Sequence, residues 1–197
     1  MTKIAFMFPG QGSMEAGMGR EVATAVPEAM AVFDEASDAA QMDLKALCFD
    51  SPVEDLVDTE VQQPALVTTS LAIDAALRAR GIRPHVVVGH SVGEFSALGS
   101  ADSLTVRDAV ALVRERGIAM AEAAKAHPGS MAAILGLADE AVENLCKRIS
   151  NVWPANYNCP GQLVISGETS SVDEACDEAQ REGARRAVRL RVSGAFH

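Results

Sequence analysis

Blocks of hydrophobic and polar positions predict alternating strands and helices in the first part of the chain. Residues 3–8 form a short apolar run that predicts a buried strand, and Pro9-Gly10 ends it. Apolar residues then recur at helical spacing to about residue 40. A looser stretch follows, and the next helix is expected to open near Pro64 and to stop at Gly81.

The same alternation continues to about residue 126. Val86-Val87-Val88 is apolar on both faces, which is typical of a strand at the centre of a parallel sheet. Thr105 is placed to cap a helix, and apolar positions follow it at helical spacing to about residue 126. These patterns predict an α/β domain over residues 1–127, with a parallel sheet like that of the α/β-hydrolases.

The order of elements changes after His127-Pro128-Gly129. The expected elements are a strand, a helix, two strands, a helix and a strand, at residues 131–137, 139–149, 152–158, 162–167, 170–182 and 185–192. Pro160-Gly161 predicts a hairpin between the two central strands. This order is that of a ferredoxin-like unit, so a small α+β subdomain is expected over residues 128–197.

Composition excludes several classes of function. Hydrophobic residues make up 48% of the 197 residues, enough for a packed core, and 17 basic against 27 acidic residues give a net charge of −10. An acidic chain with few aromatic rings is a poor nucleic-acid binder. No apolar run approaches the length of a membrane span or of a signal-peptide core, so no membrane association and a cytoplasmic location are expected.

Cysteine and histidine spacing argues against a metal site. The four cysteines form no CxxC pair, and the four histidines are scattered along the chain. We therefore expect free, mostly buried thiols in a reducing compartment and no bound metal.

The strongest chemical signal is Gly89-His90-Ser91-Val92-Gly93, directly after the valine strand. A G-x-S-x-G sequence between a strand and a helix is typical of a nucleophile elbow, which lifts the serine above the sheet. The helix behind it offers N–H groups and a positive dipole end to a developing oxyanion. The alternative is an ordinary glycine-rich turn.

A serine nucleophile needs a base, and His197 is the best placed histidine. His90 adjoins the serine on the tight turn, His85 lies at the far end of the strand, and His127 lies at the domain boundary. His197 follows a strand and a break at Ser193-Gly194 that could return a side chain to a cleft. It could also be simply the terminal residue of a fragment.

Arg116 is the third candidate. It lies beside Gly117, near the apolar stripe of the predicted helix, and a guanidinium held there could grip a carboxylate with two parallel hydrogen bonds. Taken alone, it could equally be a surface arginine.

Together, the motifs resemble those of the malonyl-CoA:acyl carrier protein transacylases and the related polyketide acyltransferase domains. The resemblance covers the whole chain and rests on five motifs in order, namely Phe8-Pro9-Gly10-Gln11-Gly12-Ser13, Gly89-His90-Ser91-Val92-Gly93-Glu94, Arg116-Gly117, Asn156-Tyr157-Asn158-Cys159-Pro160-Gly161-Gln162 and Gly194-Ala195-Phe196-His197. Met14 stands where the family usually has Gln, which puts a loop contact in doubt.

The resemblance implies ping-pong acyl transfer without a cofactor. Ser91 attacks the thioester of malonyl-CoA with His197 as base, and the backbone N–H groups of Gln11 and Val92 hold the oxyanion. Arg116 pairs with the free carboxylate of malonate. The thiol of acyl carrier protein then takes the malonyl group from Ser91.

The resemblance also implies a substrate pocket. Its residues are His90, Met120 and Phe196, of which Phe196 would crowd an α-methyl group and so favour malonyl over methylmalonyl. Phe196 could instead merely pack the seam between domains. Related chains run well past this histidine, so we expect an N-terminal part of a longer transacylase, acting as a monomer.

Polyanionic CoA and acidic carrier proteins demand a local basic surface on this acidic chain. Asn158, Arg185 and Arg186 are the candidates, with the last strand carrying further arginines. The alternative is a solvated strand face balanced by Glu178 and Glu182.

Three other functions stay open. A discrete polyketide-pathway acyltransferase would share every motif, whereas a serine thioesterase or hydrolase would share only G-x-S-x-G and would need an acidic residue to orient its histidine. A non-catalytic interaction module is the third. Arg116 and the Gln11 loop favour transfer of a carboxylated acyl group over hydrolysis.

Overall fold

A computed structural model describes residues 3–192 and 194–197. The chain divides into two compact units, Met1–Ala119 and Met120–His197, which are described separately below. The division lies inside one long helix, α6 (Val106–Ala126), and the boundary expected after His127 follows the end of that helix.

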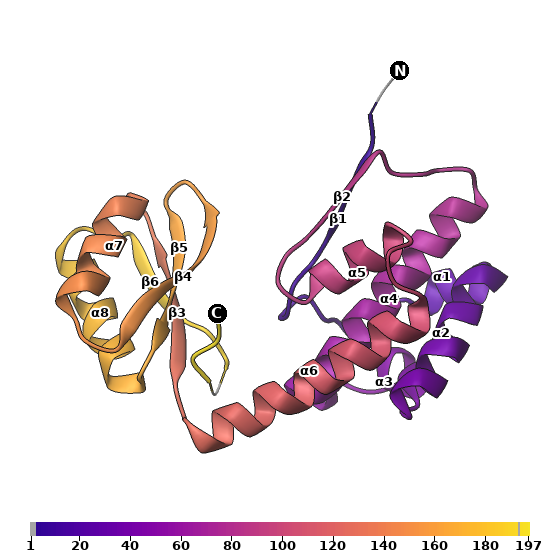
Figure 1. Cartoon of the computed structure of the whole chain (residues 1–197), viewed down its shortest axis with the longest axis horizontal. Coiled ribbons are helices and arrows are strands. Elements are labelled where there is room, and N and C mark those ends of the chain that lie inside the picture. The colour runs from indigo at the N-terminus through magenta and orange to yellow at the C-terminus, as the bar shows by residue number, and fades with distance from the viewer. Residues whose placement is uncertain (1–2, 193) are drawn as a thin grey trace. The chain divides into compact units, whose positions relative to one another are not determined.

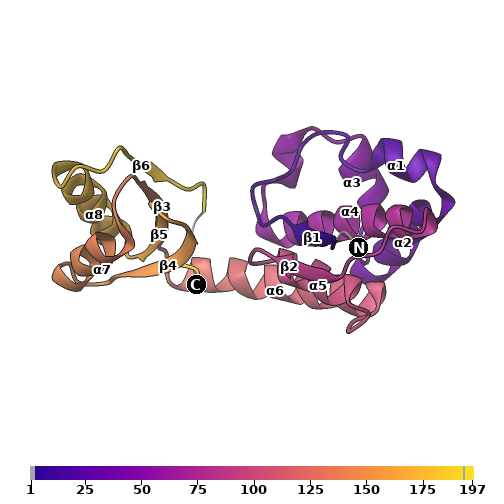
Figure 2. The ribbon, with the colours of Figure 1, turned by 90° about the horizontal axis from the view of Figure 1, so that it is seen from above.

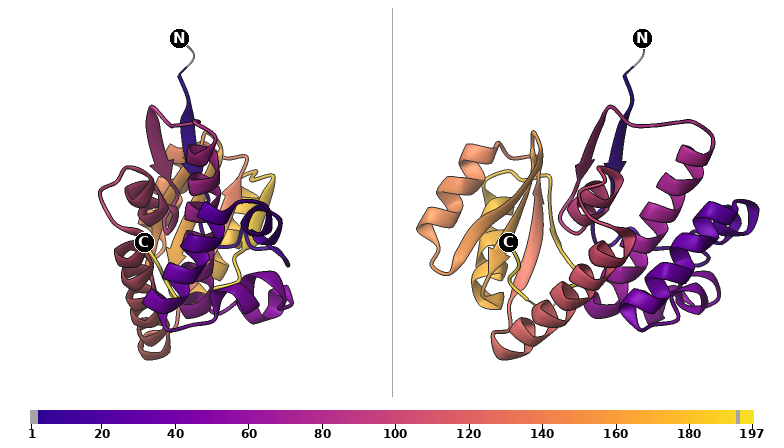
Figure 3. Two further views of the ribbon diagram at one scale, coloured as in Figure 1. Left: turned by 90° about the vertical axis from the view of Figure 1, so that its right-hand side faces the viewer. Right: turned by 45° about the vertical axis from the view of Figure 1, so that its right-hand side comes forward.

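The first unit contains one parallel strand pair and a set of helices (Figure 1). Besides α6, its elements in chain order are β1 (Ala5–Phe8), α1 (Arg20–Ala25), α2 (Pro27–Ala40), α3 (Leu44–Phe49), the 3-10 helix η1 (Val53–Leu56), α4 (Thr59–Ala79), β2 (Val86–Gly89) and α5 (Gly93–Ser100). β1 and β2 run side by side in the same direction, with Ala5 opposite Val86 and Phe8 opposite Gly89 (Figure 3). This parallel pairing confirms the predicted α/β class.

The core of the first unit lies mainly among helices. Phe33 on α2, Val67 on α4 and Val110 on α6 are each fully buried. The rings of Phe33 and Phe49 meet edge to face with their centroids 4.7 Å apart. Since aliphatic and aromatic side chains from several helices share this core, burial of their apolar faces holds the helices together.

Helix α4 begins earlier than its sequence pattern indicated. Pro64 was expected in the first turn, but the helix starts at Thr59, and the N–H groups of Val61 and Gln62 donate to the carbonyl of Asp58. Pro64 therefore lies in the second turn. The starting signals are Asp58 just before the helix and Glu60 in its first turn, which suits the positive end of the helix dipole.

The expected burial of the valine strand is wrong for the described chain. Val86 and Val88 are 54% and 49% exposed, and Met7 on β1 is 80% exposed. β2 pairs only with β1 among the described residues, so its second edge and much of its surface meet solvent. Apolar composition indicates a preference for burial but does not supply the neighbouring element that covers the strand.

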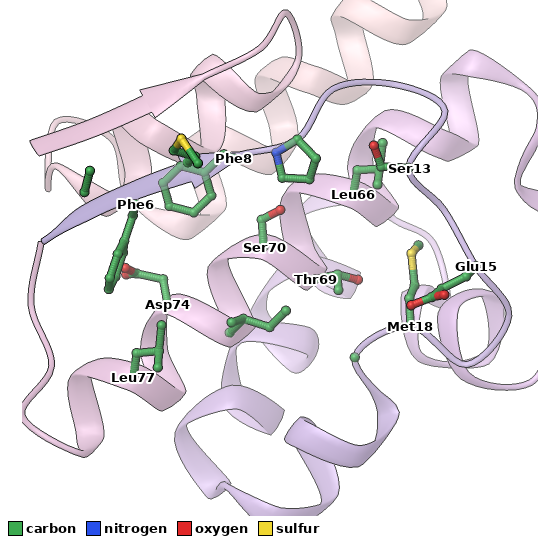
Figure 4. A pocket seen from close by; sticks show the side chains of 15 residues that line it. Phe6, Phe8, Ser13, Glu15, Met18, Leu66, Thr69, Ser70, Asp74 and Leu77 are labelled. Carbon is green, nitrogen blue, oxygen red and sulfur yellow. The ribbon is translucent and has the colours of Figure 1, made fainter.

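A cavity of about 400 Å³ lies between β1 and α4 (Figure 4). Phe6 and Phe8 line it from the strand, and Leu66, Ser70 and Leu77 line it from the helix. This face of α4 thus borders an open cavity. The lining residues include none of the predicted site residues.

The second unit is a ferredoxin-like subdomain, as predicted. Its elements after the end of α6 are β3 (Ser130–Leu135), α7 (Asp139–Arg148), β4 (Val152–Cys159), β5 (Gln162–Gly167), α8 (Thr169–Arg181) and β6 (Arg186–Arg189). The sheet is antiparallel with strand order β4-β5-β3-β6. β6 is shorter than the strand expected over residues 185–192.

The two faces of this sheet differ. Helices α7 and α8 cover one face (Figure 2), where Ile134, Leu145 and Ile165 belong to a fully packed cluster. On the other face, Met131 and Val164 form a smaller cluster against which the chain after β6 packs. Leu190, Val192 and Phe196 therefore lie over the face without helices.

Candidate active site

Ser91 occupies a strained turn between β2 and α5. Its φ angle is 51°, in the left-handed region that a serine rarely adopts. A Cβ at Gly89 would lie 2.1 Å from the carbonyl carbon of Gly93, and a Cβ at Gly93 would lie 2.4 Å from the carbonyl oxygen of Phe8. Only glycine fits at either position, so the two glycines permit the sharp turn of a nucleophile elbow.

The first turn of α5 closes directly behind the serine. The N–H of Gly93 donates to the carbonyl of His90 at 2.9 Å, and the N–H of Glu94 donates to that of Ser91 at 3.0 Å. Val92 is fully buried, whereas His90 is exposed. The elbow thus anchors Val92 in the core and leaves its neighbours nearer the surface.

Arg116 forms a hydrogen bond with Ser91. Its Nη2 donates a hydrogen bond to Ser91 Oγ at 3.1 Å, and its Nη1 donates to Gln63 Oε1 at 2.6 Å. Ser91 and Arg116 are 25 positions apart in sequence. Arg116 is therefore not a fully solvated arginine, because its guanidinium is half-buried beside Ser91.

Helix α6 brings Arg116 to this position. Thr105 caps the helix as predicted, since its Oγ1 accepts from the N–H of Asp108 at 3.0 Å. Further along, a Cβ at Gly117 would lie 2.8 Å from the Cα of Glu60 and 2.9 Å from the carbonyl oxygen of Thr59. Gly117 thus lets α6 approach the start of α4 closely enough for the adjacent arginine to reach Gln63.

Burial changes the pKa of the Arg116 guanidinium. Desolvation lowers the pKa of Arg116 from its ordinary value, and the nearby carboxylate of Glu94 opposes that shift by raising the pKa. The guanidinium carbon also lies 5.9 Å from the centroid of the Phe95 ring, within cation–π range. A partly desolvated cation binds an anionic partner more strongly than a solvated one.

Two glutamines on α4 belong to the site and were missed by the sequence analysis. Gln63 Nε2 donates to Thr59 Oγ1 at 2.8 Å, and Thr59 Oγ1 donates to Gln11 Oε1 at 3.2 Å. Gln62 Oε1 accepts from the N–H of Gly12 at 2.8 Å. Two adjacent glutamines in the first turns of a helix that starts at Thr59 could have indicated this role. They were not recognised because the helix was expected to start at Pro64.

Other predicted site residues belong to the second unit. His197 is exposed and has a φ angle of 61°. Phe196 is half-buried against the sheet face without helices, in the cluster that includes Met131 and Val164. Met120, on α6, is the first residue of this unit.

The predicted basic residues share one end of the ferredoxin-like sheet. Arg186 lies opposite Leu135, which lies opposite Gln162, which lies opposite Cys159, the neighbour of Asn158. This row spans four strands, so its ends are about 14 Å apart at ordinary strand spacing. Arg185, Arg186 and Asn158 all have solvent-accessible side chains.

The acids expected to balance this surface pair elsewhere. Glu178 forms an ion pair with Arg181, and Glu182 forms one with Arg148. Within residues 3–192 and 194–197, no ion pair of Arg185 or Arg186 is found.

The cysteines are free thiols, as predicted. Cys48 and Cys146 are buried, Cys176 is half-buried and Cys159 is exposed. Within the described residues, no three His, Cys, Asp or Glu side chains gather closely enough to hold a metal ion. None of the helices in that part of the chain is both long and apolar enough to cross a membrane.

A serine on a strand-to-helix elbow, flanked by an arginine, defines a nucleophile-elbow protein of the α/β class. The chain belongs to the acyl transferase domain family, which matches residues 5–197. This membership confirms the family resemblance of its motifs.

Curated relatives align over the full chain. It is 47% identical to a malonyl CoA-acyl carrier protein transacylase of Bacillus subtilis (strain 168) and 41% identical to one of Staphylococcus aureus (strain MRSA252), with 100% of this chain covered in both. The chain spans 63% and 65% of the length of these two relatives.

Solved structures show the same fold. The malonyl CoA-acyl carrier protein transacylase of Coxiella burnetii matches with a TM-score of 0.94 and 41% identity, over 98% of this chain and 63% of that one. A malonyl-transacylase solved in complex with a type II polyketide synthase acyl carrier protein matches with a TM-score of 0.93 and 41% identity, over 98% of this chain and 64% of that one.

Proposed function

We propose that this chain carries the nucleophile and the carboxylate-binding arginine of a malonyl-CoA:acyl carrier protein transacylase of fatty-acid biosynthesis. The observation that carries the proposal is the hydrogen bond from Arg116 to Ser91 Oγ. Relatives at 41–47% identity bear that name. The activity needs no cofactor of its own, because the thioester bond of malonyl-CoA supplies the activated acyl group.

The distance between the Arg116 guanidinium and Ser91 Oγ limits the length of the acyl group that can contact both. Arg116 Nη2 lies 3.1 Å from the oxygen that attacks the thioester carbonyl. A carboxylate that replaces Ser91 as the partner of the guanidinium must therefore lie close to that carbonyl. Malonyl, with one carbon between the two groups, meets this requirement, whereas acetyl leaves a half-buried cation without an anionic partner.

In the first half-reaction, Ser91 Oγ forms an ester bond with the malonyl carbonyl carbon while the carbon–sulfur bond to CoA breaks. The serine proton passes to His197 and from there to the departing CoA sulfur. The backbone N–H groups of Gln11 and Val92 are the proposed donors to the oxyanion. Thr59 bonds the Gln11 side chain and so supports that loop.

In the second half-reaction, the phosphopantetheine thiol of acyl carrier protein attacks the malonyl-serine ester. Its proton passes to His197 and then to Ser91 Oγ, which regenerates the free serine. His90, Met120 and Phe196 are the proposed walls of the acyl pocket, with Phe196 disfavouring an α-methyl group. Malonyl-CoA is accordingly expected to exceed methylmalonyl-CoA in kcat/KM.

Arg185, Arg186 and Asn158 are the proposed contacts for CoA phosphates and for the carrier protein. They share one end of a sheet, and Glu178 and Glu182 are paired with other arginines. Arg185 and Arg186 are the proposed positive surface on a chain whose net charge is −10.

The test follows the acyl group through both half-reactions. The full-length protein is incubated with malonyl-CoA, freed of excess CoA, and then mixed with phosphopantetheinylated acyl carrier protein. The expected result is malonyl on the carrier protein and little free malonate before the carrier is added. Rapid release of free malonate without the carrier would identify a hydrolase instead.

A further inference from the structure

A line of hydrogen-bonded side chains runs from the substrate arginine to the loop before α1. Arg116 Nη1 donates to Gln63 Oε1 at 2.6 Å, Gln63 Nε2 donates to Thr59 Oγ1 at 2.8 Å, and Thr59 donates to Gln11 Oε1 at 3.2 Å. Gln63 is fully buried. A buried amide with both ends bonded has little freedom to turn.

The arginine sets the direction of the first two bonds in this line. A guanidinium only donates, so the carbonyl oxygen of Gln63 must face Arg116 and its NH2 group must face Thr59. The Thr59 hydroxyl then accepts from Gln63 and keeps its own proton for Gln11. Gln63 is thereby fixed as an acceptor toward Arg116.

A neutral acceptor suits this position. Gln63 holds one side of the guanidinium without cancelling its charge, and the Nη2 side faces Ser91 Oγ. A carboxylate at the same place would pair with Arg116 and compete with the substrate's carboxylate. A hydrophobic side chain would leave a half-buried N–H without its acceptor.

We propose that Gln63 is a positioning residue that sets the selectivity for carboxylated acyl groups by holding Arg116 against the nucleophile, with Thr59 anchoring the amide. The inference rests on the proposed function. In this scheme Gln63 acts through Arg116, to which it is hydrogen-bonded.

Gln62 provides a matched control. It is the same residue type, adjacent on α4, and is 3% exposed. Its amide bonds the N–H of Gly12 and the carbonyls of Leu56 and Val57. Gln62 therefore supports the loop and has no hydrogen bond to Arg116 among the described residues.

The experiment compares Gln63→Leu, Gln62→Leu, Arg116→Ala and the Gln63→Leu/Arg116→Ala pair in the full-length protein. Acylation of Ser91 is followed with malonyl-CoA and with acetyl-CoA, which lacks the carboxylate. Gln63→Leu is expected to lower kcat/KM for malonyl-CoA by about 10- to 100-fold and that for acetyl-CoA by less than about threefold. Gln62→Leu is expected to lower both by the same factor.

The double variant decides whether Gln63 works through the arginine. With Arg116 already removed, Gln63→Leu should change malonyl loading by less than about twofold. An undiminished effect in the Arg116→Ala background, or equal losses for both substrates in Gln63→Leu, overturns the inference. Gln63→Met, which keeps an unbranched chain of similar length, is compared in the same way should Gln63→Leu fail to fold.

Malonyl loading of the wild-type protein distinguishes a failure of the proposed function from a failure of the inference about Gln63. If the wild-type protein takes no malonyl on Ser91, the proposed function fails and the inference fails with it. If the wild-type protein loads malonyl and Gln63→Leu loses no selectivity, only the inference fails.

Discussion

At the scale of single residues, the candidate site combines a strained serine with a cation held in place. Ser91 keeps a left-handed φ of 51°, and Arg116 reaches it from α6. Backbone strain persists only where the surroundings fix it, and the packing around Gly89 and Gly93 is so close that neither position admits a Cβ. The strained backbone of Ser91 and the positive charge of Arg116 therefore both act on Ser91 Oγ.

Replacing Arg116 by lysine tests the shape of the cation. A lysine side chain there would keep the positive charge but would lose the fork that bonds Gln63 and Ser91 at once. Arg116→Lys is expected to lower kcat/KM for malonyl-CoA by about tenfold, mostly through KM, with acetyl-CoA nearly unaffected. Steady-state kinetics with both substrates measures this, and wild-type kinetics in the lysine variant would show that charge alone suffices.

Some of this site was predictable at the residue scale and some was not. Ser91 and its glycines form a local motif, so the elbow follows from consecutive residues. Arg116 could be proposed from its place beside Gly117. Its contact with Ser91, 25 positions away, cannot be predicted from the spacing of neighbouring residues. Gln63 was missed because its role depends on where α4 begins.

At the scale of elements, two close approaches build the site: α5 against β1, and α6 against α4. Both depend on a glycine, Gly93 in the first and Gly117 in the second. Periodicity predicted the helix that follows Thr105, and Val110 and Val113 on that helix are buried. It misjudged the valine strand, whose exposure depends on which neighbours pair with it.

The approach of α5 to β1 predicts a large effect at Gly93. Gly93→Ala would put a Cβ 2.4 Å from the backbone oxygen of Phe8, and a backbone atom moves less easily than a side chain. We expect a loss of about 2 kcal/mol in the free energy of unfolding, although alanine normally favours a helix over glycine. Urea unfolding measures the difference.

Gly99 on the same helix is the matched control. The three atoms nearest to a Cβ there all belong to the side chain of Leu71, the closest at 2.8 Å, and a side-chain methyl group yields more easily than a backbone atom. Gly99→Ala should therefore cost clearly less than Gly93→Ala. Equal losses for the two variants would contradict the role given to the backbone contact.

At the scale of the whole molecule, charge and burial are distributed unevenly. The chain is acidic overall, yet one end of the ferredoxin-like sheet carries Arg185 and Arg186. The ferredoxin-like topology followed from the order of elements, whereas the pairing of Glu178 and Glu182 with other arginines did not. Long flexible side chains form ion pairs with residues that are close in space, and strand alternation does not predict which residues those are.

Charge reversal at this end of the sheet tests its proposed role. Arg185→Glu/Arg186→Glu should raise KM for malonyl-CoA and for acyl carrier protein by about five- to tenfold at low ionic strength, and less at high salt. Arg181→Glu is the control, because Arg181 already pairs with Glu178 on the same subdomain. Unchanged KM values for both partners would mean that the arginines are merely solvated.

Burial of a thiol predicts a pH dependence of stability. Burial raises the pKa of Cys48 from 9.0 to about 11. Below pH 9 the thiol is neutral in both states, and between pH 9 and 11 it ionises first in the unfolded chain, so stability falls as pH rises. From about pH 8 to about pH 10, the wild-type protein should lose about 1 kcal/mol more than Cys48→Ala in urea unfolding. Parallel pH profiles would contradict this burial.

The central claim is that Ser91 accepts a malonyl group under the control of Arg116. The most direct measurement is mass spectrometry of the full-length protein after brief incubation with malonyl-CoA, followed by peptide mapping. The predicted result is one malonyl group on the peptide that contains Ser91, absent in Ser91→Ala and strongly reduced in Arg116→Ala. A wild-type protein without that added mass, or with malonyl on another residue, would contradict the account.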